Sequence, residues 1–174
     1  MLIQGKSFVL RPWKRGDEVS LRENANNIKI ARNIGAPFPH PYLMRDARKW
    51  VEGSIRKKIQ IDDFAIVVEG KAVGGIGVKK LSGLHKGTME LGYWLGEGYW
   101  GRGIASQAAS LVSAYAFRRH KPARLQAMVY SWNPASARVL IKAGFKREAV
   151  LRRHVSTGDQ LADQWIFAKF PKGR

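Results

Sequence analysis

The stretch that decides the fold reads Glu90-Leu-Gly-Tyr-Trp-Leu-Gly-Glu-Gly-Tyr-Trp-Gly-Arg-Gly-Ile-Ala-Ser106. A strand signal, Met89 to Leu95, leads into four closely spaced glycines, and an apolar helical pattern begins at Ile104. Glycine lets backbone amides approach a ligand closely, and the first turn of a helix adds unpaired N–H groups and about half a positive charge. The pattern therefore predicts a site for an anion such as a pyrophosphate. The alternative is a glycine-rich turn that only joins a strand to a helix.

Two other phosphate-binding motifs do not fit this loop. A nucleoside-triphosphate P-loop ends in Gly-Lys-Ser/Thr, whereas this loop ends in Gly103-Ile104-Ala105. A dinucleotide fingerprint needs a third glycine where Ser106 stands, and an acidic residue about 20 positions further on, which this sequence lacks.

The rest of the chain divides into regular strand and helix signals. The N-terminal part predicts a strand Ser7–Trp13, a helix capped by Asp17 and running to about Ile30, an extended proline-rich segment 36–42 and a helix Asp46–Gln60. A meander of strands follows at Phe64–Glu69, Ala72–Lys80 and Met89–Leu95, with turns at Gly70-Lys71 and Lys86-Gly87 and a bulged strand at Gly74–Gly77. After the glycine loop we expect a helix Ile104–Arg119, a strand Arg124–Tyr130, a helix between the cap Asn133 and Gly144, and strands Phe145–Arg152 and Leu161–Phe170.

This order predicts an α/β (α+β) fold with one domain over residues 1–174. The length suits a single core. The β-α-β crossover requires a parallel strand pair, so the central sheet should be mixed, mostly antiparallel, and flanked by helices.

The composition limits the chemistry. The sequence has no cysteine, which excludes disulfides, a thiolate nucleophile and cysteine metal ligands. Its four histidines show no metal-binding spacing, so no metal is expected. No stretch approaches the roughly 20 apolar residues that span a bilayer, and no secretory signal is visible, so we expect a cytoplasmic protein without a membrane partner.

The formal net charge is +18, from 31 Lys and Arg against 13 Asp and Glu. Such a charge attracts polyanions, which leaves open a phosphorylated cofactor or acidic substrate, a nucleic acid or ribosome partner, and a solvated basic surface without a partner.

The segment from Glu90 to Leu95, with Tyr99-Trp-Gly-Arg-Gly-Ile-Ala105 after it, resembles the acetyl-CoA motif of the GNAT superfamily, and most of all that of the ribosomal-protein (Rim-type) N-acetyltransferases. Three other stretches are similar to that branch: Leu10-Arg11-Pro12 with Asp17, Asn133-Pro-Ala-Ser136 with Gly144-Phe145, and Arg152-Arg-His154 with Asp163. The likeness spans nearly the whole chain. One position departs from the superfamily pattern, because Gly98 stands where Gln or Arg is frequent.

The resemblance implies the GNAT fold and acetyl-CoA as co-substrate. Main-chain groups of Trp94 and Leu95 would contact the pantetheine and the thioester, and Asn133 would hydrogen-bond the pantetheine arm. The pyrophosphate would be held by six residues of the loop and the helix start: Gly101, Arg102, Gly103, Ile104, Ala105 and Ser106.

The same resemblance implies direct attack of a neutral amine on the thioester. Amines are mostly protonated at neutral pH, so a base is needed, and Glu90 is the candidate. The alternative for Glu90 is a sheet carboxylate that balances nearby cations. Ser136 is the candidate acid for the departing thiolate, although a serine at the third position of a capped helix often serves the backbone instead.

Two functions are therefore weighed. The first is an N-acetyltransferase whose acceptor is a protein N-terminus or a small-molecule amine. The second is a basic RNA- or ribosome-binding module that keeps a CoA-binding fold without turnover. The sequence leaves both a monomer and a homodimer open.

Overall fold

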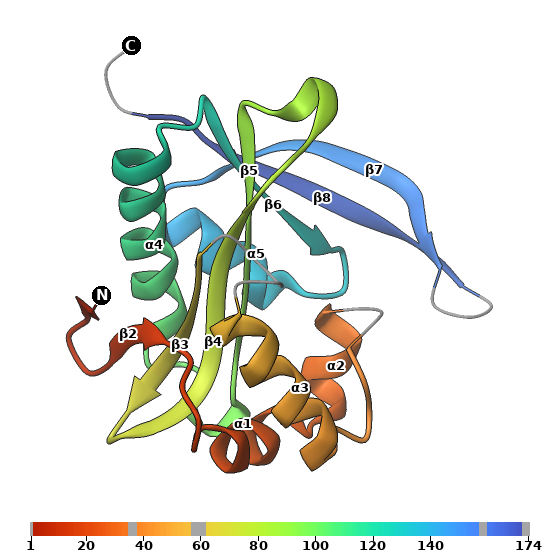
Figure 1. Ribbon diagram of the computed structural model, residues 1–174. Helices are drawn as coiled ribbons and strands as arrows, with labels where there is room; N and C mark the ends of the chain where they lie inside the picture. The colour runs from red at the N-terminus through yellow and green to blue at the C-terminus, as the bar shows by residue number, and fades with distance from the viewer. Residues whose placement is uncertain (1, 35–37, 57–61, 157–159, 172–174) are drawn as a thin grey trace.

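The computed structural model describes residues 2–34, 38–56, 62–156 and 160–171 of the 174-residue chain (Figure 1). In chain order the elements are β1 (Ile3–Gln4), β2 (Val9–Pro12), α1 (Glu18–Ala25), α2 (Ile28–Ile34), α3 (Met44–Ile55), β3 (Asp62–Val68), β4 (Lys71–Lys80), η1 (Gly83–His85), β5 (Thr88–Leu95), η2 (Glu97–Tyr99), α4 (Ile104–His120), β6 (Arg124–Tyr130), α5 (Pro134–Lys142), β7 (Lys146–Ser156) and β8 (Leu161–Lys169).

The described strands form one eight-stranded sheet in the order β1-β2-β3-β4-β5-β6-β8-β7. Neighbouring strands are antiparallel except β5 and β6, which are parallel. The parallel pair follows from the crossover through α4, because a chain that returns along a helix starts the next strand in the same direction. The mixed, mostly antiparallel sheet predicted from the sequence is confirmed.

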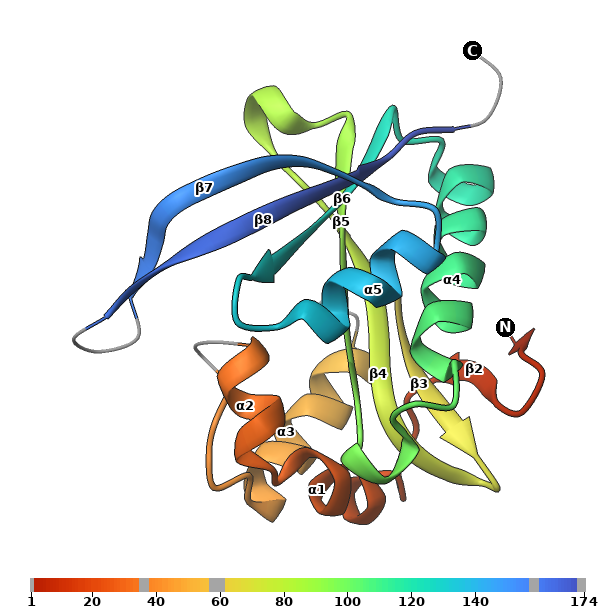
Figure 2. The ribbon, with the colours of Figure 1, turned by 180° about the vertical axis from the view of Figure 1, so that it is seen from behind.

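Helices cover both faces of this sheet (Figure 1, Figure 2). On one face, Ile104 and Val112 of α4 and Leu140 of α5 join a buried cluster with the strands. On the other face, Leu21 of α1 and Val51 of α3 belong to a second buried cluster. None of the described helices is long and apolar enough to cross a membrane.

The parallel pair β5–β6 is short, and the two strands then diverge (Figure 2). Pairing covers only Thr88–Glu90 of β5 against Arg124–Gln126 of β6. Beyond Glu90, β5 stays paired with β4 as far as Leu95, while β6 stays paired with β8. A wedge therefore opens between β5 and β6 directly after Glu90.

Two of the predicted helices have different bounds in the structure. The single helix expected from Asp17 to about Ile30 is broken into α1 and α2. The side chain of Asn27 accepts a hydrogen bond from the backbone N–H of Lys29 at 2.8 Å, and this local contact competes with a continuous helix. The second helix, α3, begins at Met44 rather than Asp46 and is helical to Ile55, while residues 57–60 of the predicted helix lie outside the described residues.

The β3–β4 hairpin also differs in detail. Its turn is Glu69-Gly70 rather than Gly70-Lys71, and both turn residues have positive φ (49° and 80°), as a two-residue hairpin turn requires. The register shifts between Ile66 and Val67, which leaves Val73 without a partner opposite it. The irregularity thus lies at Val73, whereas Gly74–Gly77, where the bulge was predicted, pair in regular register with both β3 and β5.

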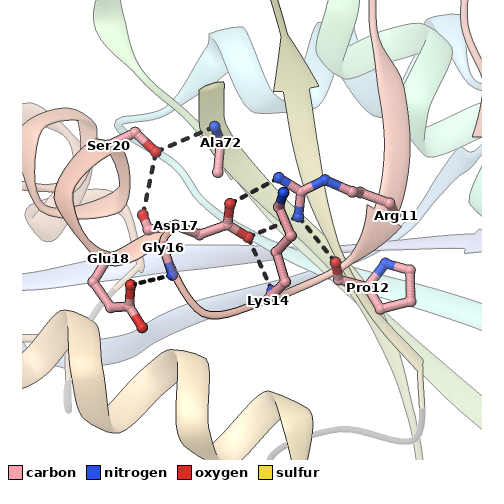
Figure 3. A network of polar contacts seen from close by, with 8 residues as sticks. All are labelled: Arg11, Pro12, Lys14, Gly16, Asp17, Glu18, Ser20 and Ala72. Atoms are coloured by element: carbon pink, nitrogen blue, oxygen red, sulfur yellow. Dashed lines mark hydrogen bonds and ion pairs between the residues drawn. The ribbon is translucent and has the colours of Figure 1, made fainter. Parts of the chain in front are cut away.

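Asp17 does not cap α1 with its side chain, as the sequence suggested, but forms an ion pair that fixes the start of the helix (Figure 3). Its two carboxylate oxygens accept hydrogen bonds from Nη1 and Nη2 of Arg11, both at 2.7 Å, and Oδ2 also accepts from the N–H of Lys14 at 3.0 Å. Ser20 Oγ donates to the carbonyl of Asp17 and accepts from the N–H of Ala72, which links α1 to β4. Asp17 is only 3% exposed, so these bonds replace its contacts with water.

Breaking this ion pair leaves a buried charge without its partner. Arg11→Ala is therefore expected to lower the free energy of unfolding by about 3–5 kcal/mol, measured by urea denaturation. Arg11→Lys keeps the charge but cannot donate to both carboxylate oxygens in the same geometry, so it should lose less. An Arg11→Ala variant within 1 kcal/mol (roughly one ordinary hydrogen bond) of the wild type would contradict this reading.

A second carboxylate, Asp63 on β3, lies in surroundings that disfavour its charged form. Burial raises the pKa of its side chain to about 6, and a hydrogen bond from Ser54 Oγ, 2.6 Å away, only partly opposes this. The folded chain therefore holds this proton more tightly than the unfolded chain does. The contribution of Asp63 to stability is best at low pH and declines as the pH rises from the ordinary value of 3.8 toward 6.

Asp63→Asn removes this titration. The free energy of unfolding of the variant, relative to the wild type, should increase as the pH rises from about 4 to 7, by at most about 3 kcal/mol. Urea denaturation across this pH range measures the difference, with Glu69→Gln in the β3–β4 turn as a control. A difference that stays constant with pH would show that Asp63 titrates normally.

Candidate functional site

The glycine loop at the end of β5 forms one end of the site. Gly101 and Gly103 both adopt φ of 76°, a left-handed conformation that side chains rarely adopt, and a Cβ atom at either position would meet nothing within 4 Å. Gly103 is the N-cap of the 17-residue helix α4, and no side chain caps this helix start. The loop thus presents bare backbone and the positive end of a long helix to the same space, which is the arrangement that binds phosphate groups.

A cavity of about 730 Å³ joins this loop to the wedge between β5 and β6. It is bounded by four parts of the fold: α2, the splayed part of β5 and β6, the loop with the first residues of α4, and α5. Of the predicted site residues, the following line it: Glu90, Trp94, Leu95, Gly101, Gly103, Ile104, Ala105, Ser106, Asn133 and Ser136.

Arg102 is the one predicted site residue that does not line the cavity. Its guanidinium lies over the ring of Tyr99, 5.3 Å from the ring centre. The main chain of Leu95 is also partly engaged, since its carbonyl accepts a hydrogen bond from the indole of Trp100 at 2.7 Å. Cofactor contacts by Arg102 and Leu95 therefore stay predictions.

Gly98, the position that departs from the superfamily pattern, is not required to be glycine by the local structure. Its backbone is outside the left-handed region, and a Cβ atom there would meet nothing within 4 Å. Neither conformation nor packing requires glycine at this position.

Glu90 lies at the vertex of the wedge, where the β5–β6 pairing ends. Its Oε1 is 2.7 Å from Nζ of Lys79 on β4, and its Oε2 accepts a hydrogen bond of 3.2 Å from Nε2 of Gln126 on β6. The Glu90 side chain is 22% exposed, so it is held by neighbouring strands yet open to the cavity. These contacts fit both interpretations of Glu90, the general base and the charge-balancing carboxylate.

Asn133 caps α5 as predicted, and its side chain accepts a hydrogen bond of 3.1 Å from the N–H of Ser136. The Ser136 hydroxyl lies 2.7 Å from the hydroxyl of Tyr93, which also donates to the Ser136 carbonyl at 3.1 Å. Burial raises the pKa of Tyr93 to about 12, and its hydrogen bond with Ser136 lowers it less, so Tyr93 keeps its proton at neutral pH.

Sequence reasoning missed Tyr93. The only local signal is the strand alternation, which places Tyr93 on the same face of β5 as Met89 and Leu91, toward α4 and α5. Its partner is 43 residues away, on another element, and no spacing rule predicts that contact.

Helix α2 is tied to both sides of the wedge. On the loop side, Glu97 accepts hydrogen bonds from Asn27 (2.6 Å) and from Lys29, and these two bonds, with Lys29 the larger cause, lower the pKa of the exposed Glu97 carboxyl. On the β6 side, the indole of Trp132 donates to Asn33 Oδ1 at 3.0 Å. The sequence analysis did not assign these contacts, which hold α2 over the cavity.

An aromatic cluster borders the site on the α1–α3 face of the sheet. Phe38 contacts Trp94 with ring centres 6.4 Å apart, and Tyr42 contacts Phe38 at 5.0 Å. The proline-rich segment thus reaches Trp94 through Phe38, while residues 36 and 37 lie outside the described residues. His154 is exposed on β7. The described residues contain no cluster of three or more side chains suited to hold a metal.

Known proteins match both the sequence and the fold. The family described as the acetyltransferase (GNAT) domain matches residues 7–146. A probable N-acetyltransferase of Bacillus subtilis, YjcK, is 35% identical over 173 residues, covering 96% of each chain. The crystal structure of a GNAT-family acetyltransferase from Bacillus anthracis superposes with a TM-score of 0.84 at 25% identity, covering 98% of each chain. A structure of RimL, a ribosomal L7/L12 alpha-N-protein acetyltransferase in complex with coenzyme A, superposes with a TM-score of 0.81 at 19% identity, also covering 98% of each chain.

The energy of the contact between the Tyr93 and Ser136 hydroxyl groups can be measured with a double-mutant cycle. Tyr93→Phe and Ser136→Ala each remove one end of the same hydroxyl pair, so their effects on the free energy of unfolding should overlap in the double variant by about 1 kcal/mol. Urea denaturation of the four proteins in a double-mutant cycle gives this coupling. Strictly additive effects would mean that the two hydroxyl groups do not interact in solution.

Proposed function

We propose that this chain, which belongs to the GNAT acetyltransferase family and is an acetyl-CoA-dependent N-acetyltransferase, acetylates a primary amine. In this proposal Glu90 is the general base. The acceptor is a protein N-terminal α-amine or the amine of a small molecule. The observation that carries the proposal is the position of Glu90 at the vertex of the cavity whose other end is the glycine loop.

The residues of the cavity fit coenzyme A. The bare backbone of Gly101 and Gly103 and the uncapped start of α4 suit the pyrophosphate, because they offer N–H groups and a positive dipole without a side chain in the way. Asn133 and the splayed edge of β5 suit the pantetheine arm, which carries amide groups that need hydrogen-bond partners. Arg138 and Lys142 of α5 also line the cavity and supply positive charge for phosphates.

The charges that line the cavity suit an anionic ligand. Its lining includes four cations, Lys29, Arg32, Arg138 and Lys142, and one carboxylate, Glu90. A ligand with several phosphate charges, bound in this cavity, would account for this excess of positive charge.

The thioester supplies an activated acyl group, and the protein residues handle the protons. Glu90 takes a proton from the ammonium form of the acceptor, so that the nitrogen lone pair can attack the thioester carbon. N–H groups of the splayed β5 edge near Trp94 stabilise the negative charge on the carbonyl oxygen. As the C–N bond forms and the C–S bond breaks, the nitrogen loses its second proton to solvent. The departing thiolate receives a proton from the Ser136 hydroxyl, which Tyr93 holds in place and which takes a replacement proton from solvent.

Glu90→Gln tests the proposal, because glutamine has the same shape but cannot take the proton. We expect kcat to fall roughly 10²- to 10⁴-fold at neutral pH and to recover in part as the pH rises, since more acceptor is then deprotonated without help. Acetyl-CoA affinity measured by calorimetry should be unchanged. Release of free CoA thiol across peptide and small-amine panels measures the rate.

A Glu90→Gln protein that turns over like the wild type would remove Glu90 from the mechanism and leave it as a charge-balancing group. The matched control is Glu69→Gln in the β3–β4 turn, which exchanges the same groups outside the cavity and should leave the rate unchanged.

A further inference from the structure

Gly92 lies at the centre of the splayed part of β5 and has no structural need to be glycine. Its φ lies outside the left-handed region, and a Cβ atom there would meet no heavy atom within 4 Å. It is an exposed position inside a strand, where glycine is unfavourable because it packs nothing and loses the most backbone entropy. Glycine inside a strand marks a bulge, a tight bend or a place where a ligand or another backbone approaches closely. Gly92 pairs with Gly77 in regular register, which leaves the close approach.

Strand alternation decides which face of the sheet Gly92 serves. The side-chain positions of residues 90, 92 and 94 face one side of the sheet, and those of Leu91 and Tyr93 face the other. The second face is the one that packs against α4, since Leu91 and Tyr93 belong with that cluster. Trp94 packs in the cluster of α1 and α3. Gly92 is therefore on the side of the sheet from which the Glu90 carboxylate is reached.

The neighbours of Gly92 across the sheet leave space beside it on both sides. Gly77 is its partner on β4 and also has no side chain. Toward β6 there is no partner, because pairing ends at Glu90. Across the wedge, Met128 lines the cavity and is 43% exposed. Along β5, Glu90 and Trp94 are each two residues away, so their Cα atoms bracket a gap of about 13 Å.

We propose that Gly92 is a specificity-determining residue, whose missing side chain forms the opening through which the acceptor amine reaches Glu90 and the thioester. This rests on the proposed function. An amine that gives its proton to Glu90, directly or through one water, must approach that carboxylate from the face that carries Glu90 and Trp94. The substituents next to its nitrogen then lie over Gly92. A side chain at position 92 would fill the space that these substituents occupy and would leave the loop and the α4 face free.

The test is a graded series at Gly92 with a matched control at Gly87. Gly92→Ala and Gly92→Val add one and three carbons to open space in a strand, where valine is favoured. Gly87→Val adds the same group just before β5, at the end of the strand away from the loop, where a Cβ atom would meet only the Cβ of Ala123 at 3.8 Å. For each protein we would measure the melting temperature, the acetyl-CoA affinity by calorimetry, and kcat/KM for amines of increasing bulk next to the nitrogen.

We expect Gly92→Val to keep its melting temperature and acetyl-CoA affinity close to the wild type. Its kcat/KM should fall by roughly 10²-fold for amines branched next to the nitrogen, because the added side chain occupies the space that their substituents need. The loss should be smaller for the least hindered amine and smaller again for Gly92→Ala, and slow hydrolysis of acetyl-CoA by water should persist. Gly87→Val should match the wild type throughout.

Three results would overturn the inference. One is equal kcat/KM for bulky amines in all the variants; another is an equal loss for every amine in Gly92→Ala; the third is a loss of acetyl-CoA affinity in Gly92→Val, which would assign Gly92 to the cofactor. A wild-type protein that binds acetyl-CoA but acetylates no amine would instead defeat the proposed function, so the two failures are distinguishable.

Discussion

The divergence of β5 from β6 after Glu90 and Gln126 is the constraint on which the site depends. Inside a sheet, every backbone N–H and C=O finds a partner on the next strand, and leaving such groups unpaired in a protein interior is costly. Beyond Glu90, the inner edge of β5 loses the partner that β6 would have supplied. In the proposed function, the pantetheine arm of coenzyme A, which has two amides, pairs with that edge. The cavity and the half-buried carboxylate of Glu90 at its vertex both follow from this one departure from regular pairing.

A wedge in a sheet has to be held open, and the fold does so with polar contacts between distant parts of the chain. Helix α2 is bonded to the loop through Glu97 and to the β6 side through Trp132. The β5 strand is bonded to the start of α5 through Tyr93. The buried Arg11–Asp17 pair fixes the start of α1, the helix that precedes α2 in the chain. The apolar clusters hold the two faces together, whereas these contacts determine the geometry of the opening.

The sequence predicted the features that depend on neighbouring residues. The glycine loop, the helix from Ile104 and the Asn133 cap were all predictable, because turn conformation, helical periodicity and capping act within a few positions. It did not predict the contacts that join residues far apart, such as Tyr93 with Ser136. It was wrong about the side chain of Asp17, since an aspartate before a helix suits a cap and an ion pair equally well, and only the fold brings Arg11 beside it. The break at Asn27 was missed because a side chain competing with the backbone leaves the apolar pattern intact.

The alternation along β5 separates the two proton transfers of the proposed reaction. Glu90 lies on the face shared with Trp94, and Tyr93, which holds Ser136, lies on the face toward α4 and α5. An amine must attack the thioester carbon from one side while the sulfur leaves on another, so a base and an acid on the same face would compete for the same space. A strand with a side-chain period of two places Glu90 and Tyr93 on opposite faces within four residues. In the proposed reaction, the splayed strand thus offers its main-chain edge to the cofactor and also keeps the groups that remove and return protons apart.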